Sequence, residues 1–399
     1  MRFTKGRRCR SPTLKALLFL FVFFTALEIT RVRRSLAPPN IDIAPARPER
    51  IYIASLHWNN ERILRSHWNQ AVTALATALG PQNVFITVYE SGSWDNSKGA
   101  LRELDSALEQ HGIRRNITLS DVTHIDEMNA PNAGPGWIET PRTRRELRRI
   151  PYLSRLRNIT LEPLQDLVRN GEHFDKVLFL NDVVFTNNDV FQLLNTNYGD
   201  YAAACSLDFS KPPSFYDTFA LRDSEGHEML TKTWPYFRSR ASRHALTTNR
   251  ATPVRSCWNG MVVMPAEPFI ATPPLSFRGT PDSLALHHLE GSECCLIHAD
   301  NPLSSKAGVF VNPNVRVGYN GDAYKAVHPD GPLLSSWQIF KGLWDNRFRR
   351  WTTTVWFKEW IVHRRVVQWR GEDKHNNEPG EFCLINEMQV LIENGWKHL

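Results

Sequence analysis

The stretch Lys176-Val-Leu-Phe-Leu-Asn-Asp182 decides the fold of this chain. Four consecutive apolar residues without polar alternation are typical of a strand buried on both faces, and such strands belong to parallel sheets covered by helices. The strand ends in a carboxylate, at the edge of the sheet where α/β proteins bind their ligands. The flanking sequence should therefore show further strands, helices and polar strand ends.

Strand and helix patterns alternate from residue 51 onward. Apolar runs predict strands over residues 51–56, 83–89, 116–119 and 261–264. Helical spacing predicts helices over residues 63–79, 101–108, 144–169 and 188–194, with a Pro- and Gly-rich loop over 128–141. This alternation predicts an α/β fold with a Rossmann-like, mainly parallel sheet and helices on both faces. No G-x-G-x-x-G, P-loop or G-x-S-x-G motif follows a strand, which disfavours a dinucleotide-binding dehydrogenase, a P-loop enzyme and an α/β-hydrolase.

The positive charge of the chain is confined to its first fifty residues. The 399 residues carry a net charge of +7, with 42% hydrophobic and 22% charged side chains. Residues 1–50 contain eleven Lys and Arg against three acids, a net +8, so the other 349 residues carry −1. A nucleic-acid-binding domain needs its basic excess on the folded part. Nucleic acid is therefore excluded as a partner.

The first fifty residues have the pattern of a membrane anchor. An apolar run over residues 16–27 extends to a segment, 14–30, of about 17 residues, the short end of what spans a bilayer. Six basic residues precede the run and three follow closely, which places the N-terminus in the cytosol and the body in the lumen. Residues 28–34 offer no small-x-small cleavage site, so a signal anchor is favoured over a cleaved signal peptide or a buried core helix.

These patterns divide the chain into five parts. We expect a cytosolic tail (1–13), a transmembrane helix (14–30), a proline-containing stem (31–48), a catalytic domain (49–335) and a C-terminal extension (336–399). Seven of the thirteen Trp residues lie in the extension. An appendage packed on the catalytic domain is the favoured interpretation, and a sugar-stacking platform is the alternative.

The cysteines and sequons suit a lumenal body. Five cysteines lie beyond residue 50, so at least one is not paired within the chain, and the spacing does not determine the disulfides. Two N-x-T sequons occur, at Asn116 and Asn158.

Polar clusters follow three of the predicted strands, over residues 55–62, 90–97 and 181–185. One such cluster alone is typical of turns that cap the next helix. Three at the same edge of a sheet favour a ligand site. We expect the nucleotide-sugar-binding residues to be Ser55, Asn59, Arg62, Glu90, Ser91 and Asp95.

The end of the buried strand resembles the metal site of GT-A nucleotide-sugar transferases. That site has an Asp-x-Asp motif, whereas this chain has Asn181-Asp182-Val183. Mn²⁺ or Mg²⁺ takes oxygen ligands and stabilises the charge on the leaving diphosphate. We expect Asp182 and Asn181 to hold the metal, Asn181 without a charge. The alternative is that Asp182 only caps the helix over 188–194.

Two upstream segments extend this resemblance. Residues 90–97 (ESGSWDNS) resemble the D-D-G-S-x-D-x-[ST] segment that holds the nucleoside, and residues 152–158 (YLSRLRN) resemble the A-R-N helix. Arg155 and Arg157 are therefore expected to neutralise the diphosphate, with a solvated helix face as the alternative. If Asn158 lines the site it cannot carry a glycan, and Asn116 is then the better sequon.

An ordered set of segments identifies a family. In chain order they are IASLHWNNERIL, VYESGSWDNSKGAL, YLSRLRNITLEPL, KVLFLNDVVF, YAAACSLDF, FYDTFALRDSEG, SCWNGMVVM and SECCLIHADNP. Over residues 50–320 they resemble the fungal capsule-associated mannosyltransferases first defined in Cryptococcus. The resemblance implies a GT-A-like fold, a single-pass type II Golgi membrane protein, and α-1,3-mannosyl transfer from GDP-mannose with a divalent cation. The acceptor would be a mannose-containing glycan of capsule or cell-wall polysaccharide.

The second half of the chain should bind the acceptor and supply the reacting group. Residues 215–223 combine rings and charges in the way sugar sites do. We expect a catalytic Asp217, and an acceptor site with Arg222, Asp223, Trp258 and Asn259. An α-linked product from an α-linked donor requires retention, by a carboxylate nucleophile or by front-face attack.

Glu293 is the preferred carboxylate, because it enters an apolar segment where an unpaired charge needs a function. Asp182 acts with it through the metal. His298 is either a further metal ligand or a core histidine, and the core is favoured. Two rival functions stay open: a transferase with another donor sugar, and a catalytically silent, lectin-like scaffold protein.

Overall fold

A ten-stranded sheet forms the centre of the protein, in the order β3-β2-β1-β6-β11-β7-β13-β10-β9 with β8 beside β7. The computed structural model describes residues 12–36, 48–130, 134–140 and 142–399. The strands of this sheet are β1 (Ile51–His57), β2 (Val84–Ser91), β3 (Arg114–Ser120), β6 (Lys176–Leu180), β7 (Ala203–Lys211), β8 (Ser214–Phe215), β9 (Arg222–Asp223), β10 (Thr252–Ser256), β11 (Met261–Pro265) and β13 (Val309–Gly318).

The sheet is mainly parallel. β1, β2, β3 and β6 pair in parallel, as do β7 and β13. β11 runs antiparallel between β6 and β7, and β10 runs antiparallel to β13. All residues of β6 are buried, and they alternate between two cores: Val177 and Phe179 on one face, Leu178 and Leu180 on the other.

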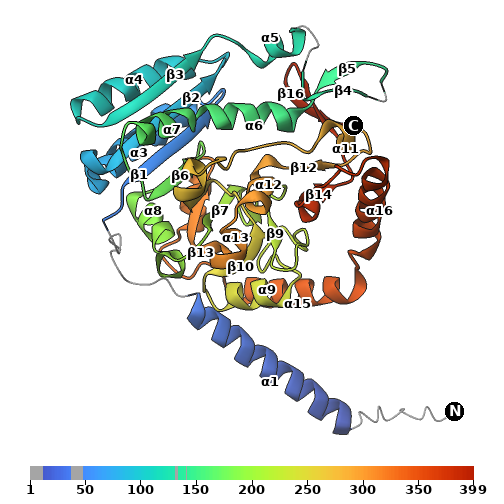
Figure 1. The fold of residues 1–399 in the computed structure, drawn as a ribbon. Coiled ribbons are helices and arrows are strands. Elements are labelled where there is room, and N and C mark those ends of the chain that lie inside the picture. Colours follow the sequence, from blue (N-terminus) through green and yellow to red (C-terminus); the bar gives the residue numbers. More distant parts are fainter. Residues whose placement is uncertain (1–11, 37–47, 131–133, 141) are drawn as a thin grey trace, which may run out of the picture.

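Helices cover both faces of the sheet. The core with Leu178 is closed by α3 (Asn69–Leu79), α4 (Ser97–Gln110) and α8 (Asn187–Leu194). The core with Phe179 is closed by α7 (Glu162–Arg169), α9 (Arg240–Thr247), α10 (Glu267–Ile270), α12 (Glu293–Asp300) and α15 (Ser336–Thr352). The predicted α/β sheet with helices on both faces is thus confirmed (Figure 1).

The helix predicted over 144–169 is in fact three elements. β5 (Arg145–Leu147) pairs with β4 (Trp137–Glu139), and two helices follow, α6 (Arg149–Ile159) and α7. Pro163 lies in the first turn of α7. A proline cannot donate its amide and clashes with the carbonyl four residues earlier, so one helix cannot continue through it. The predicted 128–141 loop contains β4, and its residues 131–133 and 141 lie outside the described residues.

Shorter elements complete the body: α2 (Glu61–Ile63), a π-helical turn (Leu64–Trp68), α5 (His124–Asn129), α11 (Asp282–Ala285), β12 (Glu290–Gly291), α13 (Ser304–Ala307) and α14 (Gly321–Val327). A capping box of Thr186 and Asp189 begins α8. Asp182 therefore does not cap that helix.

Helix α1 (Pro12–Ser35) projects from the body (Figure 1). Among the described residues it is the helix long and apolar enough to cross a membrane, with a mean hydropathy of 1.8 over Thr13–Ser35 and only 6% of its apolar window buried. This exposure excludes a buried core helix. α1 meets α15 through Phe21 against Trp344 and through an ion pair between Glu28 and Arg347. The tail residues 1–11 and the stem residues 37–47 lie outside the described residues.

The C-terminal residues fold against the body. After α15 come α16 (Trp356–Glu372), β14 (Leu384–Ile385) paired with β12, and a hairpin of β15 (Gln389–Ile392) and β16 (Gly395–His398). The Cys295–Cys383 disulfide joins this region to α12, and a second disulfide joins Cys205 to Cys257. The fifth cysteine of the body, Cys294, is free and buried.

Leu178→Ala should show how strongly the fold depends on β6. Leu178 is fully buried, so the substitution removes apolar contacts and leaves a cavity. We expect the free energy of unfolding to fall by about 2–5 kcal/mol in urea denaturation. Leu286→Ala is the matched control, because Leu286 is 60% exposed and its loss should change stability little. Equal losses in the two variants would contradict this account.

Candidate active site

A cavity of about 220 Å³ opens at the carboxyl ends of β1, β2 and β6. Its lining includes the polar side chains of Asn60, Ser91, Arg149 and Asp182, together with Trp396 of the C-terminal hairpin. The three strands are neighbours and parallel, so the polar residues that follow them in sequence are brought to one edge. We call this cavity the strand-end cleft.

Asp182 lies in the cleft directly after β6. Asn60 Nδ2 donates to its Oδ2 at 2.8 Å, and Oδ1 accepts no side-chain hydrogen bond from the described residues. Burial raises the pKa of Asp182 to about 6, against the weaker opposite effects of its own backbone amide and of Asn60. Asn60 was not among the predicted site residues, although it belongs to the polar cluster over 55–62.

Asn181, the other predicted metal ligand, is engaged with tryptophans. Its side-chain Oδ1 accepts from Trp258 Nε1 at 3.2 Å, and its carbonyl accepts from Trp68 Nε1 at 3.0 Å. Asn181 thereby ties the end of β6 to the turn before β11.

Three acids from distant segments come together behind this edge. Asp208 of β7 is fully buried, and it accepts hydrogen bonds from the Asp217 amide at 3.2 Å and from the Tyr319 hydroxyl at 3.1 Å. Burial, and then the charge of Asp217, raise the pKa of Asp208 to about 7. Burial also raises the pKa of Asp217, and the nearby charge of Glu293 adds to this. Asn259 donates to the Asp217 carbonyl at 3.0 Å.

Asp208 was not predicted as a site residue. It lies in the quoted YAAACSLDF segment, but as a single acid at the end of an apolar strand it carries no pattern of its own. Only the pairing of β7 with its neighbours brings it beside Asp217.

Glu293 forms a buried ion pair with Arg157. Arg157 Nε lies 3.0 Å from Glu293 Oε1, and its guanidinium stacks 4.6 Å from the Trp258 ring centre. Burial opposes the ionisation of Glu293, but Arg157, helped by Arg149, outweighs it and lowers the pKa of Glu293. Glu293 is therefore an ionised carboxylate inside the protein.

Arg149 is the cation of the cleft that sequence analysis missed. It donates to Gln389 Oε1 at 2.7 Å, and its guanidinium lies 3.9 Å from the Trp396 ring centre. Its charge acts on both Glu293 and Asp217. Arg149 begins α6, two turns before the predicted Arg157, so the same A-R-N-like helix supplies both arginines.

The C-terminal hairpin completes the cleft. Leu391, Gly395 and Trp396 line it, and the His124 ring Nε2 lies 2.7 Å from the Glu393 carbonyl oxygen. In Figure 1 the hairpin reaches the end of the body where α5 and α6 lie. Nothing local in the sequence sets Trp396 apart from the other six tryptophans of the extension.

Four predicted nucleotide-binding residues hold the loops of the cleft. Ser55 donates to the Leu180 carbonyl at 2.6 Å, and the Asn59 side chain accepts from the Trp94 amide at 2.8 Å. Glu90 is fully buried and accepts from the Ser93 amide. Asp95 accepts from the amides of Glu61 and Ser97, both at 3.0 Å. These contacts join the first two strand-end loops to each other.

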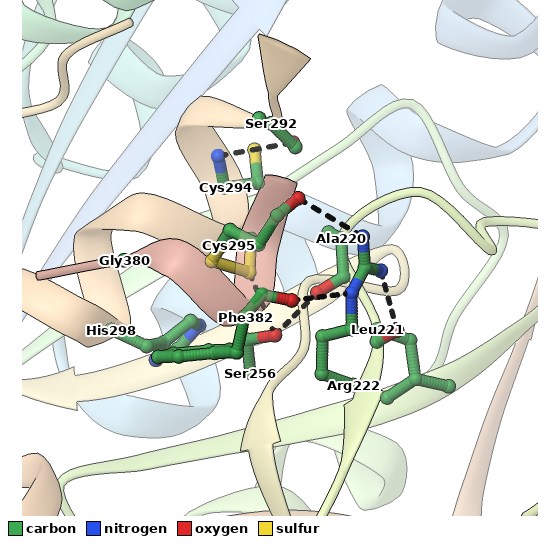
Figure 2. The surroundings of a disulfide bond; sticks show 12 residues. Ala220, Leu221, Arg222, Ser256, Ser292, Cys294, Cys295, His298, Gly380 and Phe382 are labelled. Carbon is green, nitrogen blue, oxygen red and sulfur yellow. Dashed lines mark hydrogen bonds between the residues drawn. A yellow bond between two sulfur atoms is a disulfide. The ribbon is translucent and has the colours of Figure 1, made fainter. Parts of the chain in front are cut away.

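Of the predicted site residues, Ser91 and Asp182 line the cleft, and four others lie well apart in other surroundings. Arg62 is exposed on α2, and Arg155 pairs with Glu127 at 2.8 Å on the surface. Asp223, the last residue of β9, is buried and accepts from the amide of Ser239, the residue before α9, at 2.7 Å. The buried Arg222 donates to the carbonyls of Phe382 and Cys383, beside the Cys295–Cys383 disulfide (Figure 2).

His298 is a buried residue beside the other disulfide. Its ring Nε2 lies 2.6 Å from the Cys257 carbonyl oxygen. The Cys205 and Cys257 sulfurs and the His298 ring lie within 4.8 Å of one another, but the disulfide leaves no thiolate for a metal. His298 therefore has the surroundings of a core histidine.

The family follows from comparison with known proteins. A sequence profile of the family described as Cryptococcal mannosyltransferase 1 matches residues 50–300. The chain belongs to this family. The resemblance stated from the ordered segments is thereby confirmed, and the protein is a member of a mannosyltransferase family. A comparison with curated protein sequences gives no match.

Solved glycosyltransferase structures resemble the chain weakly. Mannosyltransferase PcManGT from Pyrobaculum calidifontis, solved with GDP-Man and Mn²⁺, is 12% identical with a TM-score of 0.38, covering 92% of this chain and 87% of its own. TarS from S. aureus is 9% identical with a TM-score of 0.35, covering 77% and 73%. The mannosyltransferase Ktr4p from S. cerevisiae is 14% identical with a TM-score of 0.29, covering 67% and 69%. These scores carry no conclusion about substrate.

The acid pair predicts a pH dependence of stability that Asp208→Asn should remove. The pKa of Asp208 in the folded protein is about 7, above its ordinary value of 3.8, so the native state binds this proton more tightly than the unfolded state. Stability should therefore fall as pH rises from about 4 to about 7. The substitution should stabilise the chain more at about pH 7.5 than at about pH 4.5, by on the order of 2 kcal/mol.

Urea denaturation at the two pH values, with EDTA present, measures this difference. Asp166→Asn is the control, because Asp166 is an exposed acid of α7 and should give no such change. An equal effect of Asp208→Asn at both pH values would refute the raised pKa.

Proposed function

We propose that this protein is a membrane-anchored glycosyltransferase that moves mannose from GDP-mannose, with retention, to a mannose-containing glycan in α-1,3 linkage. The observation that carries the proposal is the strand-end cleft, where Asp182 and Arg149 face one cavity. A carboxylate that follows β6 and a guanidinium from the start of α6, in one cavity at the carboxyl ends of parallel strands, suit a metal-bound diphosphate. Family membership supports mannose as the transferred sugar.

Asp182 is the proposed ligand of a divalent cation, Mn²⁺ or Mg²⁺. Its Oδ1 has no side-chain partner among the described residues, while Asn60 orients the carboxylate through Oδ2. An oxygen donor of this kind suits a hard cation, which would offset the charge on the diphosphate. The Asn181 amide oxygen already accepts one hydrogen bond, from Trp258, so one lone pair is left for the cation. Arg149, rather than the paired Arg157, is the cation free to meet the diphosphate.

Glu293 and Asp217 are proposed to act on the sugar side. Glu293 is kept ionised by Arg157, so its negative charge suits the positive charge that develops on a sugar during transfer. Burial and a neighbouring acid raise the pKa values of both Asp208 and Asp217, which favours their protonated forms. A protonated carboxyl can donate a hydrogen bond to a hydroxyl of an acceptor glycan and can accept one from another hydroxyl. Trp258 and Asn259 position these acids through Arg157 and the Asp217 carbonyl.

The cellular setting is part of the proposal. α1 would anchor a type II protein in the Golgi membrane with residues 48–399 in the lumen, in the synthesis of capsule or cell-wall polysaccharide. The exposed apolar surface of α1 and the two disulfides support a membrane and an oxidising compartment. A catalytically silent scaffold is the second candidate, favoured by the engaged side chain of Asn181 at the position of a metal-binding acid.

Transfer from GDP-mannose with Mn²⁺ tests the function. We expect the full chain to hydrolyse or transfer GDP-mannose in preference to other nucleotide sugars, and EDTA to abolish this. Asp182→Ala should lower kcat by about a hundredfold or more, because the diphosphate charge loses its offset. Asp166→Ala, an exposed acid outside the cleft, is the control and should retain full turnover.

Binding separates the enzyme from the silent scaffold. Wild-type protein that binds Mn²⁺ and GDP-mannose but turns nothing over with any acceptor would support the scaffold. Turnover that is unchanged in Asp182→Ala would remove Asp182 from the mechanism.

A lumenal body should carry a glycan on Asn116 and none on Asn158. Asn116 is exposed on the edge strand β3. The Asn158 amide both donates to and accepts from the backbone of Phe277, each at 2.8 Å, so its nitrogen is engaged. We expect Asn116→Gln to abolish the mobility shift that a glycosidase produces in protein from secretory membranes, and Asn158→Gln to leave it. A shift retained in Asn116→Gln would contradict this assignment.

A further inference from the structure

A second polar pocket, of about 240 Å³, lies where α9, α15 and α1 meet. We call it the arginine pocket, after the charged residues that line it: Arg240, Arg243 and His244 of α9, Arg347 and Arg350 of α15, and Glu28 of α1. None of these residues belongs to the strand-end cleft. In Figure 1, α9 and α15 lie at the base of α1, at the opposite end of the body from α5 and β16.

The positive charges of the arginine pocket are not balanced. Glu28 is its single acid, and both carboxylate oxygens accept from Arg347, at 2.5 and 2.7 Å. Arg350 donates to the Asn346 amide oxygen at 3.0 Å, and Arg243 donates to backbone carbonyls. Arg240 makes no hydrogen bond or ion pair with the described residues. Three guanidiniums thus face one small pocket without a carboxylate partner among those residues.

These charges repel one another. Burial, and then the guanidiniums of Arg350 and Arg347, lower the pKa of Arg243 to about 10, and the more distant Glu225 and Asp223 only partly offset this. His244 adds no acid to offset them: its Nε2 accepts a hydrogen bond from Arg250 at 3.1 Å. Because neighbouring guanidiniums repel one another, a bound anion would lower the electrostatic energy of the cluster. Arginine forks match phosphate oxygens in particular.

The surroundings of the pocket indicate where a phosphate would come from. The apolar α1 contacts α15 beside the pocket, with the Phe21 and Trp344 rings 5.1 Å apart. α15, which lines the pocket, and the following helix α16 also expose large rings: Trp337, Phe348, Trp351, Trp356 and Trp360. Tryptophan is enriched where a protein meets the headgroup region of a bilayer. With α1 in a bilayer, the arginine pocket would lie at the level of lipid phosphates.

We propose that the arginine pocket binds a phosphate group and that a membrane phospholipid supplies it. The phosphate site stands on the pocket itself, whereas the lipid source rests on the proposed anchor. Headgroup binding at α9 and α15 would hold the body against the membrane and orient the strand-end cleft away from it.

Thermal unfolding of the full chain in neutral detergent with EDTA, followed by tryptophan fluorescence, tests the proposal. The probes are dioctanoyl phosphatidic acid, dioctanoyl phosphatidylcholine and inorganic phosphate. Phosphatidic acid at about a hundred times its Kd should raise Tm by about 3 °C. Phosphatidylcholine should raise it less, because its choline offsets the phosphate charge. Inorganic phosphate should require much higher concentrations than phosphatidic acid.

The double variant Arg240→Gln/Arg350→Gln should lose the shift, since it removes two unpaired charges and no backbone contact. Arg349→Gln is the matched control, because Arg349 lies on the same helix but pairs with Asp345 outside the pocket. Each shift is measured against the same variant without ligand, so an altered starting Tm does not affect the comparison.

Each outcome decides a different point. A shift that survives in the double variant, or no shift with any probe, would overturn the phosphate site. Inorganic phosphate as effective as phosphatidic acid would overturn the lipid source and leave a free-phosphate site. GDP-mannose turnover should be unchanged in the double variant, so failure of the pocket and failure of the proposed transferase are measured separately.

Discussion

Burial of β6 on both faces is the constraint on which the rest of the structure depends. Val177 and Phe179 enter one core and Leu178 and Leu180 the other, so the strand can sit only in the middle of a covered sheet. The first polar side chains after it must then emerge at the sheet edge. Asn181 and Asp182 are these residues, and β1 and β2, parallel to β6 in the same sheet, deliver their own polar loops to the same place.

The ionisation of the buried acids depends on which charged side chains lie beside them. Arg157 keeps Glu293 ionised, whereas burial and a neighbouring acid raise the pKa values of Asp208 and Asp217. The neighbouring acid is Asp217 for Asp208 and Glu293 for Asp217, and neither carboxylate has a cation in direct contact among the described residues. Arg149 lies between these groups and the cleft, where its charge acts on Glu293 and Asp217. A site with one ionised acid, two acids of raised pKa and one cation in the cleft offers different partners to a diphosphate and to a sugar. The arginine pocket differs, because Arg347 has a carboxylate partner, Glu28, and its other three arginines have none among the described residues.

Sequence patterns located five of the ten strands of the sheet and part of the site. The predicted strands at 51–56, 83–89 and 116–119 correspond to β1, β2 and β3, because continuous apolar runs need no distant information. The prediction of one helix over 144–169 was wrong in extent, because it followed the helical spacing of apolar residues and did not take Pro163 as a break. Asp208, Arg149 and Trp396 were missed, since each is a single residue whose role comes from segments far away in the chain. Arg222 was predicted to bind the acceptor because of its charge, but it donates hydrogen bonds to backbone carbonyls of the C-terminal region.

The sequence by itself determined the fold class, the family, the membrane-helix candidate and Asp182 at a strand end, because each depends on local pattern or segment order. Tertiary structure alone decided which charges are paired, which cysteines are joined and what closes the cleft. These depend on contacts between residues such as Arg157 and Glu293, 136 positions apart, and such contacts leave no trace in local periodicity. Their energies arise from burial and proximity, which exist only once the chain has folded.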